Sequence, residues 1–110
     1  MDTLTKEPVL KNPYQDISIK KSAQVLRALN HSLRQEILQT IGERGRITVT
    51  ELYVKLKLEQ SVASQHLAIL RKQNFVTTKR DGKQIYYSVN NDRVHNVIDL
   101  ARKIIHVDAY

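Results

Sequence analysis

LEQSVASQHLAILRKQNFVTTKRDGKQIYYSV, residues 58–89, is the stretch that decides the fold of this chain. Its first half predicts a helix from about Gln60 to Gln73. Apolar side chains recur on one face of this helix at helical spacing, at Ala63, Leu67 and Leu70. Asn74 is where we expect the helix to end, because asparagine tolerates the left-handed backbone conformation that closes helices.

The second half of the stretch predicts a β-hairpin. Val76–Arg80 and Lys83–Val89 are the predicted strands, and Asp81-Gly82 between them is the strongest short signal for a hairpin connection. One face of the second strand is expected to cover the core, with Ile85, Tyr87 and Val89. A polar-faced helix followed by a basic-tipped hairpin is the layout of a winged helix-turn-helix. Such a unit places the helix in the major groove of DNA and the hairpin on the neighbouring backbone.

The rest of the chain predicts one mainly helical domain around this unit, over residues 16–108. Apolar periodicity predicts further helices, at residues 16–29, from about 33 to 42–45, at 50–57 and at 92–106, and a very short strand at 47–49. The expected order is α-α-β-α-α-β-β-α, mainly α with a small β-hairpin. Residues 1–15 contain Pro8 and Pro13 and no periodicity, which predicts a flexible N-terminal arm.

The basic charge of the chain is concentrated around the predicted winged unit. The net charge is +7, and residues 44–83 hold nine lysines and arginines against three acids. This distribution is typical of a protein that binds phosphates. Charge alone is equally typical of a surface that lysines keep in solution, so the motif has to decide between the two.

Composition excludes several other classes of protein. No apolar run reaches the length of a membrane span, and the N-terminus lacks the basic-then-apolar pattern of a secretory signal. The chain has no cysteine, which excludes disulfides, thiolate metal sites and thiol redox switches. No glycine-rich phosphate loop and no evident nucleophile–base pair is present. We therefore expect a cytoplasmic protein that is not an enzyme.

Side chains suited to DNA recognition lie on the polar face of the helix and in the hairpin. Gln60 or Gln65 suits a two-bond pairing with adenine, and Ser61 and Ser64 suit phosphates or bases. The basic side chains at the end of the helix suit the DNA backbone, and those of the hairpin suit phosphates or the minor groove. The predicted DNA-binding residues are Gln60, Ser61, Ser64, Gln65, His66, Arg71, Lys72, Lys79, Arg80, Lys83 and Gln84.

Two segments of the chain resemble the ArsR/SmtB-type winged-helix repressors. Ser61–Arg71, SVASQHLAILR, has the family's Ser-x-x-Ser-x-His-Leu-x-x-Leu pattern, and the hairpin behind it contains Tyr86-Tyr87. Ala28–Leu38, ALNHSLRQEIL, resembles the family's entry into its second helix. The likeness spans about residues 20–105 and implies a dimeric transcriptional repressor that leaves its operator when an effector binds. Asn74 departs from the family's usual glycine, and it supplies the same helix ending.

His66 has two interpretations that the sequence leaves open. In the family motif a histidine is usual at this position. Its imidazole either contacts a DNA phosphate or supports the helix from its flank, since its spacing to Val62 and Ile69 permits partial burial.

The resemblance also implies two kinds of metal site. One kind uses Cys-Val-Cys, and here Tyr53 stands where a thiolate is needed. The other kind pairs the last helices of two subunits. His95 and His106 have its spacing of ten intervening residues, but Arg93 and Ala109 occupy two further ligand positions. Zinc normally takes four ligands, so we expect no cofactor and keep the two histidines only as an alternative zinc pair.

The last helix has more apolar surface than a monomer of this length covers comfortably, so we expect a homodimer with a two-fold contact. The predicted interface residues are Ile19, Ala23, Leu26, Val94, Ile98, Ala101 and Ile105. The alternative is that both helices pack only within their own subunit. A polar seam beside the apolar stripe fits the rim of such an interface, with Asp99 paired to Arg102 or Lys103.

Together these features predict a DNA-binding transcriptional regulator, a repressor that an unidentified effector releases from a double-stranded operator. The helix over residues 60–73 is expected to read the major groove, and the hairpin over residues 76–89 to contact the backbone or minor groove. We expect the effector to change the angle between subunits, so that the two helices no longer fit successive grooves. The alternative is a winged-helix module that binds another protein and no operator. RNA binding is less favoured, because stacking aromatics on a sheet face are missing.

Overall fold

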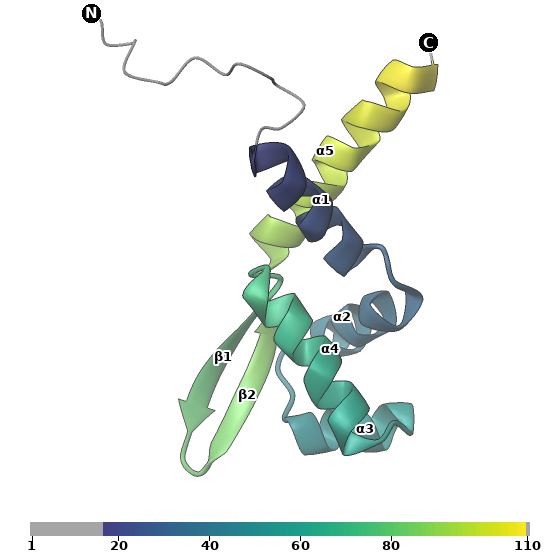
Figure 1. Cartoon of the computed structure of the whole chain (residues 1–110). Coiled ribbons are helices and arrows are strands. Elements are labelled where there is room, and N and C mark those ends of the chain that lie inside the picture. The colour runs from purple at the N-terminus through teal and green to yellow at the C-terminus, as the bar shows by residue number, and fades with distance from the viewer. Residues whose placement is uncertain (1–16, 110) are drawn as a thin grey trace, which may run out of the picture.

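The structure is a computed structural model that describes the backbone of residues 17–109 and the side chains of residues 19–105. Its elements are α1 (Ile17–Leu29), α2 (Ser32–Arg44), α3 (Val49–Leu56), α4 (Gln60–Lys72), β1 (Val76–Asp81), β2 (Gln84–Val89) and α5 (Asn91–Ala109) (Figure 1). This order confirms the predicted mainly helical, winged helix-turn-helix fold. The arm predicted for residues 1–15 lies outside the described residues.

Helix α3 begins earlier than predicted because Thr48 caps it. The Thr48 hydroxyl accepts a hydrogen bond from the Glu51 amide (3.1 Å), and the Glu51 carboxylate accepts one from the Thr48 amide (3.0 Å). This reciprocal pair draws Val49 into the helix, so the predicted short strand is reduced to a single bridge between Ile47 and Tyr87. The bond from the Thr48 amide is also the main reason that the pKa of Glu51 lies below its usual value.

Two helices end at residues with left-handed backbone. Asn74 has a φ of 65°, which confirms the predicted ending behind α4, and Lys57 has a φ of 56° behind α3. Helix α5 is capped by Asn90 and begins at Asn91, one residue before the predicted start at residue 92. The Asn90 side-chain oxygen accepts a hydrogen bond from the Arg93 amide (3.3 Å).

The hairpin turns one residue later than predicted. Its last residue pair joins Asp81 to Gln84, so Gly82 and Lys83 form the two-residue connection. Gly82 has a φ of 65°, which a type II′ turn requires at its first central position and which glycine adopts without strain. The prediction that Asp81 belongs to the connection is therefore wrong, and Asp81 is the last residue of β1.

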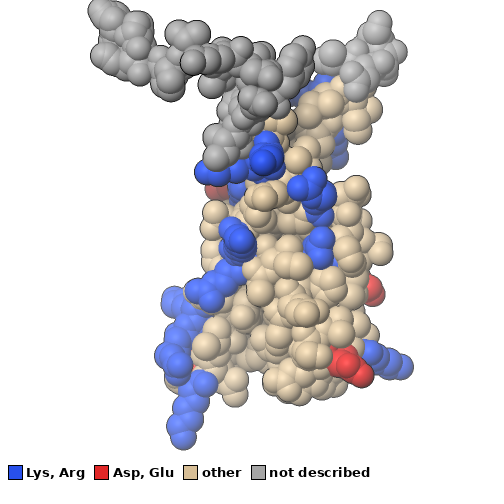
Figure 2. Space-filling view, viewed as in Figure 1, with Lys and Arg blue, Asp and Glu red and all other residues tan. Residues whose placement is uncertain are grey.

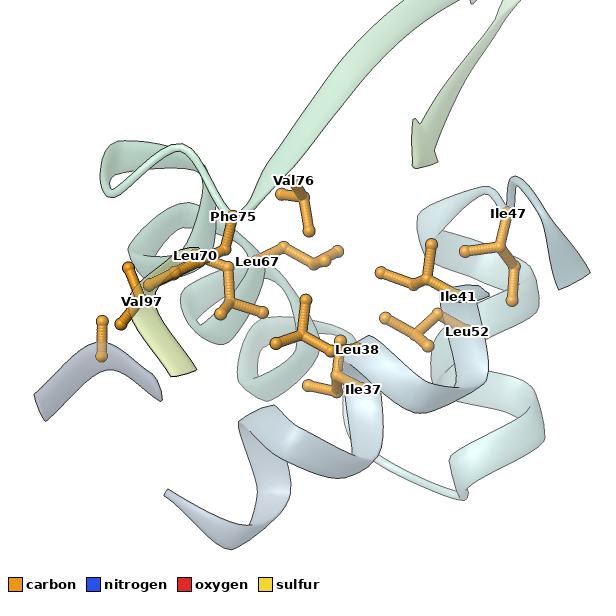
Figure 3. Close-up of a cluster of buried hydrophobic side chains, with 11 residues drawn as sticks. Ile37, Leu38, Ile41, Ile47, Leu52, Leu67, Leu70, Phe75, Val76 and Val97 are labelled. Carbon is orange, nitrogen blue, oxygen red and sulfur yellow. The ribbon is translucent and has the colours of Figure 1, made fainter. Parts of the chain in front are cut away.

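The core lies where α2, α3, α4 and the base of the hairpin meet, and its side chains point toward one another (Figure 3). Its largest fully buried side chains are Ile37, Ile41, Ile47, Leu52, Leu67, Leu70, Phe75 and Val76. Tyr87 and Val89 pack against this cluster as predicted, but Ile85 does not, because it is 45% exposed. The hairpin projects beyond the body, and only its base reaches the core (Figure 1).

Candidate nucleic-acid interface

The outer face of α4 carries the small polar side chains that the sequence predicts to contact DNA. Gln60, Ser61, Ser64 and Gln65 are exposed, with exposed Ala68 beside them, while the apolar positions of the helix are buried. These side chains both donate and accept hydrogen bonds, as contact with base edges requires. The surface over α4 is largely free of charged side chains (Figure 2). The helix therefore offers a neutral, polar face of the kind that enters a major groove.

A groove lies between the C-terminal half of α4 and the hairpin. Its volume is about 400 Å³, and it is lined by Ser64, Ala68, Arg71, Lys72 and Tyr87. Arg71 and Lys72 are exposed at the end of the helix, so their charged groups are free to turn toward the groove. Two cations and two hydroxyl groups around an open groove suit a phosphate of a nucleic-acid backbone.

The hairpin holds the second group of predicted contacts. Lys79, Arg80, Lys83 and Gln84 are all exposed. Figure 2 shows basic side chains following one another down the edge of the molecule that the hairpin forms. Cations thus lie beside the neutral face of α4. This arrangement is typical of winged units whose helix contacts bases and whose hairpin contacts phosphates.

Arg46 fixes the hairpin to the body of the domain, a role that sequence reasoning missed. Its guanidinium carbon lies 3.8 Å from the centre of the Tyr86 ring, and its Nη1 lies 3.1 Å from a carboxylate oxygen of Asp81. Beside it, Ile47 and Tyr87 exchange two backbone hydrogen bonds of 3.0 and 2.8 Å. Asp81 is the only acid of the hairpin, so this ion pair also neutralises the one group there that would repel a phosphate.

His66 lies on the flank of α4, against α2. Its Nδ1 is 3.2 Å from Nη1 of Arg34, and its ring centre is 4.9 Å from that of His31. Burial, followed by the neighbouring His31 and Arg34, holds the pKa of His66 below its usual value. Direct contact of His66 with DNA stays a prediction, and the contacts present here are those of the supporting role. Sequence reasoning did not foresee that Arg34 would be its partner.

The face shared by α1 and α5 is apolar and open. Ile19 and Ile105 are 55% and 65% exposed, and the other predicted interface residues, Ala23, Leu26, Val94, Ile98 and Ala101, are partly buried. A cavity of about 450 Å³ lies between the two helices, with Leu26, Ile98, Ala101 and Ile105 in its lining. Exposed aliphatic surface of this kind is typical of a protein interface.

The zinc pair suggested as an alternative falls partly outside the described residues. His95 is exposed, and the side chain of His106 is not described. Asp99 lies 3.6 Å from Arg102, which confirms one of the two ion pairs predicted for the rim. Among side chains 19–105 no group of three or more histidine, cysteine, aspartate or glutamate residues comes together as metal ligands do. No helix within residues 17–109 is long and apolar enough to cross a membrane.

Comparison with known proteins relates this chain to bacterial transcriptional regulators in sequence and in structure. Residues 31–78 match the family described as bacterial regulatory protein, arsR family. The transcriptional repressor PagR of Bacillus anthracis is 34% identical over 88 residues, which cover 80% of this chain and 88% of PagR. The transcriptional activator HlyU of Vibrio cholerae is 31% identical, over 76% of this chain and 77% of HlyU. The crystal structure of NolR from Sinorhizobium fredii is similar with a TM-score of 0.69 and 34% identity, over 89% of this chain and 95% of NolR.

Proposed function

Since this chain belongs to the arsR family of bacterial regulatory proteins and is a DNA-binding transcriptional regulator rather than an enzyme, we propose that it is a repressor that binds a two-fold operator as a homodimer. The relative PagR is a transcriptional repressor, whereas HlyU is a transcriptional activator. The cytoplasm, where bacterial DNA lies, is the proposed place of action.

The observation that carries this proposal is that neutral polar side chains and basic side chains occupy separate, neighbouring parts of one face of the molecule. Exposed serines and glutamines cover the first turns of α4, and cations flank them at the end of the helix and along the hairpin. We propose that Gln60, Ser61, Ser64 and Gln65 contact base edges and adjacent phosphates. The backbone contacts are assigned to Arg71, Lys72, Lys79, Arg80, Lys83 and Gln84.

The proposed dimer joins the apolar faces of α1 and α5 across a two-fold axis. Ile19 and Ile105 are more than half exposed in the single chain, and burial of such aliphatic side chains drives association. A two-fold dimer presents two copies of α4 to successive major grooves, about 34–36 Å apart. An effector that changes the angle between the subunits would then release both half-sites together.

The proposed effector is not zinc. Two of the four ligand positions suggested by the family resemblance hold Arg93 and Ala109, and neither residue is a zinc ligand.

The test is fluorescence anisotropy on DNA from upstream of the chain's own gene, with a scrambled duplex of equal length as competitor. Specific binding in chelator, unchanged by excess zinc, is the expected result. Gln65→Ala should weaken binding and relax the preference for the operator, because each good base contact discriminates by about 1–3 kcal/mol. Gln39→Ala, at an exposed glutamine of α2, serves as the matched control. Failure to bind either duplex would refute operator binding and leave the protein-interaction alternative.

A further inference from the structure

One guanidinium group connects three elements of the fold. Arg34, in the first turn of α2, donates hydrogen bonds to the carbonyl oxygens of Ala28 (2.7 Å) and Arg27 (3.1 Å) at the end of α1. Its Nη1 lies 3.2 Å from Nδ1 of His66 on α4. Arg34 is only partly exposed and lies outside the surface proposed to contact DNA. Phosphate binding therefore does not explain why an arginine stands at this position.

A second histidine makes the same region depend on an unprotonated ring. Nδ1 of His31 accepts hydrogen bonds from the amides of Leu33 (3.2 Å) and Arg34 (3.4 Å) and so caps the start of α2. Amides and guanidinium groups only donate, so both imidazoles must offer a lone pair at Nδ1. A protonated imidazole carries hydrogen on both nitrogens and can accept no hydrogen bond there. The observed arrangement therefore requires both rings to be neutral.

We propose that Arg34 is a positioning residue for DNA recognition, which acts through His66 to hold α4 against the end of α1, and that acid opens this link by protonating His66. The inference rests on the proposed function, because it needs α4 to contact DNA and α1 to join the two subunits. The position of α4 relative to α1 then sets the spacing of the two recognition helices in the dimer. Loss of the link would weaken operator binding although no DNA-contacting group has changed.

The charges around His66 support the inference that its protonation opens the link to Arg34. Arg34 of α2 and His31 of the preceding loop face its ring, and α1 contributes the carbonyl oxygens that Arg34 already uses. Among the described residues no carboxylate pairs with Arg34. A proton on His66 would therefore meet a guanidinium group and a second imidazole, with no acid beside Arg34 to offset the repulsion.

The pH dependence of operator binding separates this role from direct phosphate contact. If His66 positions α4, affinity should fall about tenfold between pH 7.5 and pH 5.5, the change expected when one hydrogen bond to a charged group is lost. If His66 instead contacts a phosphate, its proton adds attraction and affinity should rise in acid. An affinity that rises or stays constant would overturn the proposal.

Matched variants assign the effect to these groups. His31→Asn/His66→Asn puts an acceptor oxygen in place of each Nδ1 and places an asparagine, a favourable cap residue, at the start of α2, so its operator affinity should no longer fall between pH 7.5 and pH 5.5. Arg34→Gln should bind about tenfold more weakly at pH 7.5 and show a flatter pH profile. His95→Asn, at an exposed histidine of α5, should keep the full pH dependence. A double variant that retains it would overturn the assignment.

A measurement without DNA keeps the proposal separate from the proposed function. NMR of the full chain with labelled histidine reports which ring nitrogen of His66 carries hydrogen. We expect an Nε2-protonated, neutral ring near neutral pH, and a pKa that rises in Arg34→Gln because one positive neighbour is gone. An unchanged pKa of His66 in that variant would refute the link whether or not any duplex binds. Absence of DNA binding together with the expected NMR shift would instead refute only the operator function and the DNA-positioning step that depends on it.

Discussion

Removal of the three hairpin cations, in Lys79→Ala/Arg80→Ala/Lys83→Ala, should weaken DNA binding through electrostatics alone. All three side chains are exposed, and Lys83 lies in the turn itself. Surface substitutions of this kind change the free energy of unfolding by about 0.5 kcal/mol or less at each site. The anchors of the hairpin, the Arg46 contacts and the backbone pairing of Ile47 with Tyr87, remain in place. The variant should therefore be folded.

The size of the effect follows from counterion release. Each phosphate contact contributes about 0.9 to the slope of log affinity against log salt concentration. Three contacts in each hairpin give about 2.7 per subunit, and two subunits on one operator give about 5. A decrease in slope approaching this value means that all three cations bind phosphates. A decrease near one third of it means that one cation in each hairpin does.

The assay is anisotropy on one operator duplex over a series of salt concentrations. Lys20→Ala/Lys21→Ala/Lys103→Ala is the matched control, because it removes the same charge from exposed positions of α1 and α5. We expect this control to keep most of the wild-type slope. Equal slopes for the wild type and the hairpin variant would refute the role of the hairpin. Equal losses in both variants would show that net charge, and not its place on the hairpin, governs binding.

Three further outcomes test other parts of the structure. Arg46→Ala should lower the free energy of unfolding by about 1 kcal/mol, since an exposed cation–π contact and a surface ion pair are lost, and Arg46→Lys should lose less; equal denaturant midpoints for all three proteins would contradict the anchor. Because the pKa of His66 is lowered in the folded protein, the unfolded chain takes up the proton first, so unfolding free energy should fall as pH decreases below about 6.5. His66→Asn should show a smaller fall in chemical denaturation at pH 7.5 and 5.5, and identical falls would rule this contribution out. Ile105→Asp should convert the proposed dimer to a monomer in sedimentation without unfolding the chain, since that side chain is 65% exposed in the single chain; a dimer that persists would place the interface elsewhere.

Local sequence patterns were sufficient to predict a residue's structural role where that role depends only on its neighbours in the chain. The buried face of α4 follows from the spacing of Ala63, Leu67 and Leu70, and Asn74 closes the helix by a backbone preference of its own. The hairpin was predicted with a connection one residue too early. Asp-Gly favours a type I′ turn in which Asp81 and Gly82 are the two central residues. The observed turn instead has Gly82 at its first central position. Cross-strand pairing and the bond to Arg46 place Asp81 in the strand instead.

The sequence by itself determined the winged unit, the exposed polar face of its recognition helix and the basic hairpin, because helical and strand periodicity express which side chains leave water. Only the tertiary structure decided which distant groups meet. Arg34 finds His66 across 32 residues, and Arg46 finds Asp81 across 35. Such partners are chosen by how α2, α4 and the hairpin pack around the shared core, and no local spacing encodes that packing. The exposed polar and basic residues that we propose to contact DNA were therefore recognisable from local pattern, and the residues that hold them in place were not.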